Sequence, residues 1–137
     1  YETITALDLF GGTGIHSVEL ASRGCTDITY VDRFKDSVTF MKKLSKEMDL
    51  PIQSVQADVY SFVKNALRKW DYIFADPPYD MSGLEEIPSF IFGSGIIADQ
   101  GFFVLEHSSK KKLAHIPEFI ESRSYGQTVF SFYAPGS

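Results

Sequence analysis

The chain has 137 residues, a net charge of −5 and 44% hydrophobic residues, which is typical of one folded domain. Its longest apolar run is far shorter than the roughly 20 residues of a transmembrane helix, so we predict no membrane association. The single cysteine, Cys25, excludes an internal disulfide and fits a reducing cytoplasm, where we place the protein. The acidic balance by itself argues against a nucleic-acid partner.

Apolar, β-branched runs alternate with helical patterns along the chain. Ile15–Arg23 and Asp36–Met48 show apolar residues at helical spacing, and Gly24 ends the first of these helices. Further helices are predicted at Val59–Leu67 and Leu84–Phe92. The predicted strands before and between the helices are, in order, Ile4–Phe10, Ile28–Val31, Ile52–Gln56, Tyr72–Ala75 and Gly101–Glu106.

This alternation, with short connections, predicts a parallel sheet covered by helices on both faces. The C-terminal part differs, because Phe119–Tyr125 and Thr128–Tyr133 flank Gly126–Gln127 in the pattern of an antiparallel hairpin. No repeat or linker divides the chain. The sequence therefore predicts a single α/β domain over residues 1–137, with a Rossmann-like, doubly wound, mostly parallel sheet of seven strands that ends in a hairpin.

A carboxylate lies at or near the carboxyl end of each predicted parallel strand. Ligands of open parallel sheets bind outside these strand ends, so the five side chains should share one crevice. A crevice lined with acids suits a ligand that carries positive charge and sugar hydroxyls, and it would repel a pyrophosphate. The five residues are Asp8, Asp32, Asp58, Asp76 and Glu106.

The loop after the first strand is rich in glycine and leads directly into a helix. Gly12 and Gly14 allow the backbone to approach a ligand closely. Asp32 lies 20 residues after Gly12, the offset of an acid that binds ribose hydroxyls, although it equally suits the cap of the following helix. A dinucleotide also fits, but Ser17 replaces the third glycine and Asp8 would face the phosphates. S-adenosylmethionine, which has an ammonium, a sulfonium and no phosphate, is the better ligand.

Asp76-Pro77-Pro78-Tyr79 follows the fourth predicted strand. Two prolines make this turn rigid, so the Asp76 carboxylate and a free backbone carbonyl point at one spot as acceptors. Accepting both hydrogens of an exocyclic amino group directs its lone pair toward an incoming methyl group and stabilises the charge of the transition state. Tyr79 adds a flat face on which a base can stack. The alternative is a proline-capped loop that only ends a buried strand.

These motifs resemble those of the class I S-adenosylmethionine-dependent methyltransferases. More narrowly, "LDLFGGTG", "ELASRG", "FADPPY" and the late "YGQT" resemble the RsmD-type guanine-N2 methyltransferases of small-subunit (16S) ribosomal RNA. The resemblance covers the whole chain and implies a class I methyltransferase fold. It also implies an enzyme that acts on ribosomal RNA in a small-subunit assembly particle. We expect a monomer without a metal. The segments that carry the resemblance are Asp8-Leu9-Phe10-Gly11-Gly12-Thr13-Gly14, Val31-Asp32, Ala57-Asp58 and Asp76-Pro77-Pro78-Tyr79.

The resemblance also implies roles for single residues. Gly12 and Gly14 would pack under the methionine part of the cofactor, with Asp8 near its amino end. Asp32 would bind the ribose hydroxyls and Asp58 the adenine amino group. The implied catalytic residues, which hold the guanine amino group, are Asp76, Pro77, Pro78 and Tyr79. The implied cofactor-binding residues are Asp8, Phe10, Gly12, Gly14, Asp32 and Asp58.

The chain departs from the family pattern at two places. Gly11 stands where the family often has alanine, a difference that we expect to be harmless. The family also has a basic N-terminal stretch ahead of the first strand, whereas this sequence begins at Tyr1 and enters a strand almost at once. We expect that this extension is missing and that its loss lowers the affinity for RNA.

Other functions fit parts of the pattern. A DNA adenine-N6 or cytosine-N4 methyltransferase shares Asp-Pro-Pro-Tyr but needs a recognition region for which this length leaves no room. Protein glutamine methyltransferases more usually have Asn-Pro-Pro-Tyr, so Asp76 weighs against that activity. The missing third glycine disfavours a nicotinamide dehydrogenase, and the intact motif disfavours a non-catalytic cofactor-binding module. His16, His107 and His115 lie at no metal-binding spacing, whereas Lys110–Lys112 is a candidate phosphate contact.

Overall fold

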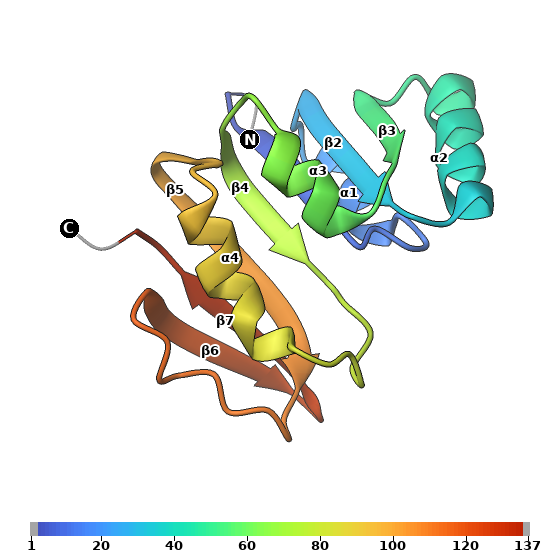
Figure 1. The fold of residues 1–137 in the computed structure, drawn as a ribbon. Helices are drawn as coiled ribbons and strands as arrows, with labels where there is room; N and C mark the ends of the chain where they lie inside the picture. Colours follow the sequence, from blue (N-terminus) through green and yellow to red (C-terminus); the bar gives the residue numbers. More distant parts are fainter. Residues whose placement is uncertain (1–2, 136–137) are drawn as a thin grey trace.

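The computed structural model, which describes residues 3–135, contains a seven-stranded sheet in the order β3-β2-β1-β4-β5-β7-β6. The first five strands are parallel, and β7 runs antiparallel to both β5 and β6 (Figure 1). This confirms the predicted mostly parallel sheet with a C-terminal hairpin. The strands are β1 (Thr5–Leu9), β2 (Asp27–Asp32), β3 (Ile52–Gln56), β4 (Trp70–Ala75), β5 (Ile97–Ser108), β6 (Phe119–Tyr125) and β7 (Thr128–Tyr133).

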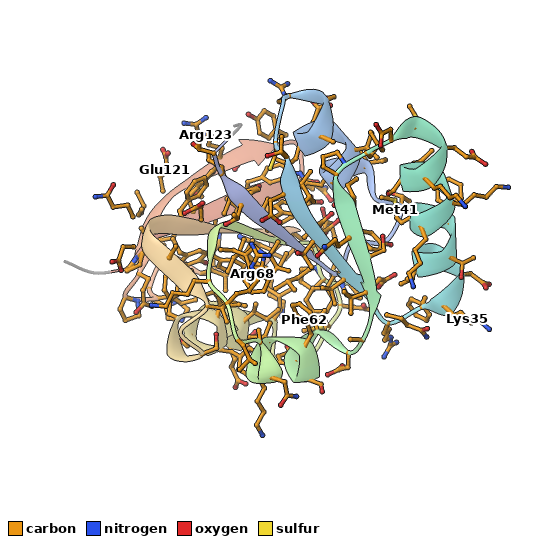
Figure 2. All side chains as sticks on the ribbon, turned by 90° about the horizontal axis from the view of Figure 1, so that it is seen from above. Lys35, Met41, Phe62, Arg68, Glu121 and Arg123 are labelled. Atoms are coloured by element: carbon orange, nitrogen blue, oxygen red, sulfur yellow. The ribbon has the colours of Figure 1, made fainter. Side chains whose placement is uncertain are left out.

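Helices cover both faces of the sheet, so it is doubly wound as predicted. In Figure 1, α3 and α4 lie in front of the sheet and α1 lies behind it. Met41 of α2 and Phe62 of α3 approach the sheet from opposite sides and pack into separate hydrophobic cores (Figure 2). No helix among residues 3–135 is long and apolar enough to cross a membrane. The helical elements are α1 (Ile15–Ser22), α2 (Lys35–Met48), α3 (Val59–Asn65), the 3-10 turn η1 (Leu84–Glu86) and α4 (Ile87–Gly93).

Most predicted elements differ from the observed ones by one or two residues at an end, and the helix predicted for Leu84–Phe92 is divided into η1 and α4. The helix predicted for Val59–Leu67 ends at Asn65, where the backbone becomes extended. The strand predicted to begin at Gly101 already begins at Ile97, because β5 continues through an irregularity in its pairing with β4. At this irregularity a Cβ on Gly101 would lie 2.8 Å from the backbone oxygen of Asp71, so only glycine fits.

The pairing register places the carboxyl ends of the central strands at one level. Leu9 of β1 pairs with Val31 of β2 and with Ala75 of β4, and Ala75 pairs in turn with Leu105 of β5. The residues that follow these partners therefore emerge together at one edge of the sheet, although they are far apart in the sequence. The acidic residues placed side by side in this way are Asp32, Asp76 and Glu106.

The loop after β1 rests on an aromatic ring of the neighbouring strand. Tyr30 is fully buried, and its hydroxyl donates a hydrogen bond to the backbone oxygen of Gly12. A Cβ on Gly11 would lie 2.2 Å from Cε2 of Tyr30, a distance at which atoms overlap. Glycine at position 11, a difference from the family that we expect to be harmless, therefore fits this chain, because the Tyr30 ring occupies the space that an alanine methyl group would need.

We predict that Gly11→Ala destabilises the protein by about 1–3 kcal/mol, the usual cost of adding a methyl group to a packed site. Urea denaturation would measure the change in the free energy of unfolding. Gly93→Ala is the matched control, because a Cβ there has no atom within 4 Å, and we expect a change below about 0.5 kcal/mol. Equal stabilities of the two variants would mean that the Tyr30 ring moves aside without cost.

Candidate active site

A cavity of about 690 Å³ opens at the carboxyl ends of the parallel strands. Its position is that expected for a ligand of an open parallel sheet. Asp8 and Gly14 are the two predicted site residues that do not line it. The predicted site residues that the structure brings together in its wall are Phe10, Gly12, Asp32, Asp58, Asp76, Pro77, Pro78 and Tyr79.

Asp8 lies under the loop, in the wall of an adjoining cavity of about 450 Å³. Its carboxylate is buried and accepts a 2.6 Å hydrogen bond from Oγ of Ser17. Burial raises the pKa of Asp8 to about 7, the Ser17 hydrogen bond opposes this change, and the negative charge of Asp76 adds to it. Asp8 therefore holds its proton more strongly than an exposed aspartate does, and a cation nearby would favour its charged form.

The two predicted loop glycines have different roles. Gly12, with φ of +53°, lines the large cavity, and a side chain there would enter open space. Gly14, with φ of +81°, precedes α1, and a Cβ on it would lie 2.2 Å from Sδ of Met41 in α2. Gly14 therefore lets the loop pack against α2, whereas Gly12 presents its backbone to the cavity.

Asp32 and Asp58 lie at the ends of neighbouring strands but differ in their partners. Asp58 caps α3 by accepting a 3.0 Å hydrogen bond from the backbone N–H of Ser61. Asp32 is not a helix cap, because α2 begins after Phe34 and has no side-chain cap. Asp32 is only 7% exposed, and its Oδ2 has no hydrogen-bond partner among residues 3–135. Such a buried acceptor is stabilised when a ligand hydroxyl donates to it.

The Asp76-Pro77-Pro78-Tyr79 turn is held at both ends. The backbone N–H of Asp76 donates to the carbonyl of Leu9 at 3.3 Å, and that of Met81 donates to the carbonyl of Pro78 at 3.0 Å. The hydroxyls of Tyr79 and Thr128 are hydrogen-bonded at 2.9 Å, which ties the turn to β7. The turn therefore has little freedom, as the two prolines predict.

Asp76 and Glu106 form a pair of carboxyl groups at the mouth of the cavity. Partial burial, the charge of Glu106 and a hydrogen bond with it together raise the pKa of Asp76 to about 6. The Tyr79 hydroxyl lies 3.4 Å from Oε2 of Glu106, and 43% of the Tyr79 surface is exposed. The arrangement offers acceptors for an amino group beside a flat aromatic face.

The cavity wall also contains residues that the sequence did not indicate. Arg33 and Phe34 follow Asp32 directly, and the Arg33 guanidinium lies 4.9 Å from the centre of the Phe34 ring. Phe34 is 58% exposed, and Tyr60 of α3 forms another part of the wall. The signal that could have indicated them is their position within two residues after the strand-end acids Asp32 and Asp58, where side chains can face a ligand.

Two of the three histidines to which we assign no function make contacts that stabilise the fold. His107 is buried and is hydrogen-bonded to Oγ of Ser131 at 2.7 Å. The His16 ring stacks on Phe74 at 3.8 Å, and burial lowers the pKa of His16 to about 4. The described residues contain no group of three side chains that could hold a metal ion. Lys110–Lys112 follow β5 at the same edge of the sheet as the cavity.

Comparison with protein families covers nearly the whole chain. The model of the family described as "Conserved hypothetical protein 95" matches residues 1–134. The chain belongs to this family. YlbH of Bacillus subtilis, a proposed rRNA methyltransferase, is 28% identical over 135 residues, which are 93% of this chain and 73% of YlbH. "Ribosomal RNA small subunit methyltransferase D" of Buchnera aphidicola subsp. Acyrthosiphon pisum is 25% identical over 109 residues, which are 78% of this chain.

These relatives confirm the resemblance to the RsmD-type methyltransferases that the motifs indicate. The chain spans 57% of the Buchnera protein, little more than half of its length. Among solved structures, HI0767 of Haemophilus influenzae, described as a proposed methylase, has a TM-score of 0.85 at 19% identity. The match covers 96% of this chain and 86% of the HI0767 chain. The likeness confirms the predicted Rossmann-like class I methyltransferase fold.

We predict that Asp8→Asn weakens the pH dependence of stability. The pKa of Asp8 in the folded protein, about 7, is above its ordinary value of 3.8. Between these values the folded state holds a proton that the unfolded state has lost, so stability falls as pH rises through this window. Urea denaturation at about pH 5 and about pH 8 should show a smaller decrease for Asp8→Asn than for wild type.

Asp99→Asn is the control for this measurement, because Asp99 is exposed at the other end of the sheet. We expect it to keep the wild-type pH dependence. If Asp8→Asn also kept the wild-type dependence, Asp8 would already be charged in the folded protein.

Proposed function

We propose that this protein is an S-adenosylmethionine-dependent methyltransferase that methylates the exocyclic N2 amino group of a guanine in small-subunit (16S) ribosomal RNA. The observation that carries the proposal is one cavity whose wall contains both the Asp32 carboxylate, with its buried Oδ2 unpartnered among the described residues, and the rigid Asp76–Tyr79 turn. We further propose that it works as a monomer in the cytoplasm, on a small-subunit assembly particle. The names of the relatives support ribosomal RNA as the substrate.

The cavity fits the proposed cofactor on its own chemistry. The buried Oδ2 of Asp32 needs a donor, and a ribose hydroxyl supplies one. Asp58 in the same wall would accept from the adenine amino group, while Gly12 and Asp8 would face the methionine end. The raised pKa of Asp8 favours this arrangement, because an ammonium group stabilises the carboxylate. When bound, S-adenosylmethionine supplies an electrophilic methyl group on a sulfonium.

The residues at the cavity mouth would prepare the amino group for attack. The Asp76 carboxylate accepts one hydrogen of the amino group, which directs the nitrogen lone pair into the cavity. As the nitrogen gains a carbon it becomes positively charged, and the carboxylate stabilises that charge more strongly than it stabilises the neutral amine. The surplus proton then passes to Asp76, whose pKa of about 6 suits it to accept and release a proton near neutral pH. Tyr79 offers its exposed face to the base.

The net charge of −5 does not exclude this substrate. The acidic residues Asp8, Asp32, Asp58, Asp76 and Glu106 are concentrated in the walls of the two cavities, where they would face amino groups and a cationic cofactor. RNA phosphates would instead meet the basic residues at the rim, and we assign Lys110–Lys112 to this contact.

Methyl-labelled S-adenosylmethionine would test the proposal directly. The protein is incubated with the labelled cofactor and with immature small ribosomal subunits, naked ribosomal RNA, DNA or a glutamine-containing peptide. We expect label in the RNA, on N2 of a guanine, identified by nuclease digestion and mass spectrometry. Label in DNA or peptide but not in RNA would assign one of the alternative methyltransferase activities. Cofactor binding without transfer to any of these would indicate a non-catalytic module.

We also predict that Asp76→Ala lowers kcat by about 100- to 1,000-fold, as expected when one group that stabilises the transition state is lost. Cofactor affinity, measured by calorimetry, should change little, because Asp76 would hold the amino group and not the cofactor. The wild-type rate should fall as pH decreases through about 6, since protonated Asp76 is a poor acceptor.

Asp80→Ala is the matched control, because Asp80 is exposed just beyond the turn and does not line the cavity. It should retain the wild-type rate and pH profile. A loss of cofactor binding in Asp76→Ala equal to its loss of rate would show that Asp76 belongs to the cofactor site.

A further inference from the structure

Glu106 lies at the proposed active site but has no role in the reaction described above. It lies in β5 between the buried residues Leu105 and His107, and it lines both the large cavity and the adjoining one, as only Asp76 and Phe10 also do among the residues of the two walls. Because Ala75 and Leu105 are paired, Glu106 emerges beside Asp76 at the edge of the sheet. A group bound between the two cavities would therefore meet both carboxylates.

The surroundings of Glu106 hold its carboxylate in place without neutralising it. The Tyr79 hydroxyl lies 3.4 Å from Oε2, and the hydrogen bond between Tyr79 and Thr128 fixes that hydroxyl from the other side. The ion pairs among residues 3–135 are three exposed arginine pairs, and neither Asp76 nor Glu106 takes part in them. Two adjacent carboxyl groups without a cation repel each other, which is consistent with the raised pKa of Asp76.

Such a pair is complementary to a ligand edge that carries several hydrogen-bond donors in a row. In guanine the C2 amino group lies next to the ring N1–H, so the edge presents donors on both atoms. In adenine the ring nitrogen next to the amino carbon on the base-pairing edge is N1, and in cytosine it is N3. Each of these nitrogens carries a lone pair and no hydrogen. A carboxylate accepts from N1–H but repels that lone pair, as both are acceptors.

We infer that Glu106 reads the N1–H of the target guanine while Asp76 holds its N2 amino group, an inference that rests on the proposed function. Glu106 is then the residue that separates guanine from adenine and cytosine, and Tyr79 positions its carboxylate. The inference also explains why two acids stand side by side where one would hold an amino group.

The substrate for the test is the RNA, or the small-subunit particle reconstituted on it, that accepts label. It is made with either guanine or 2-aminopurine at the labelled nucleotide. 2-Aminopurine keeps the C2 amino group but has a lone pair at N1. We expect wild type to prefer guanine by at least about 100-fold in kcat/KM, and Glu106→Gln to reduce the preference below about 10-fold. The glutamine amide can donate to the N1 lone pair, so activity on 2-aminopurine should rise.

Glu85→Gln removes the same charge from an exposed position outside both cavities and should keep the wild-type preference. The loss of O6 in 2-aminopurine affects all three proteins equally, so it does not alter the comparison. If Glu106→Gln lowered the rates on both substrates by the same factor, or if wild type used both equally well, the inference would be wrong. Absence of label from every RNA would instead contradict the proposed function itself.

Discussion

The in-register parallel pairing of the central strands is the constraint on which the site depends. Because β1, β2 and β4 end at one level, and Leu105 of β5 pairs with the last residue of β4, the acids that follow these residues meet at one edge of the sheet. Burial of Asp8 and partial burial of Asp76 disfavour their charged forms, and the negative charges of neighbouring acids add to this effect. The pKa values of about 7 for Asp8 and about 6 for Asp76 are the result. A ligand with cationic and donor groups relieves this repulsion, so the same pairing selects what the cavity binds.

The packing beneath the cavity makes its backbone rigid. The Tyr30 ring fills the space under Gly11, and Met41 of α2 fills the space beside Gly14. The loop after β1 therefore rests on side chains of β2 and α2, and a change in that core would move the cavity floor. On the other side, the bond between Tyr79 and Thr128 joins the Asp76 turn to the hairpin. A rigid site of this kind keeps its acceptors in place before the substrate arrives, which favours catalysis by positioning.

Much of the fold was predictable because the hydrophobic periodicity of the elements and the positions of the turn residues between them agree along the chain. Apolar strands alternate with short amphipathic helices, and Gly126–Gln127 separates the last two strands. The parallel direction of the first five strands follows from the helical connections between them, since such crossovers join parallel strands. The bulge in β5 was not predicted, because it depends on how Gly101 meets the neighbouring backbone and not on a local preference.

The sequence by itself determined the strand-end acids, the glycine loop and the Asp76–Tyr79 turn. Each is a local pattern that directly follows a strand recognisable from its run of apolar residues. Only the tertiary structure decided which of these residues share a wall. It separated Gly14 from the cavity, identified Asp58 and not Asp32 as a helix cap, and placed Phe34 beside the site. It also brought Glu106 to Asp76. Charge coupling and burial depend on distances between strands, and those distances are set by pairing across the sheet and by packing against the helices.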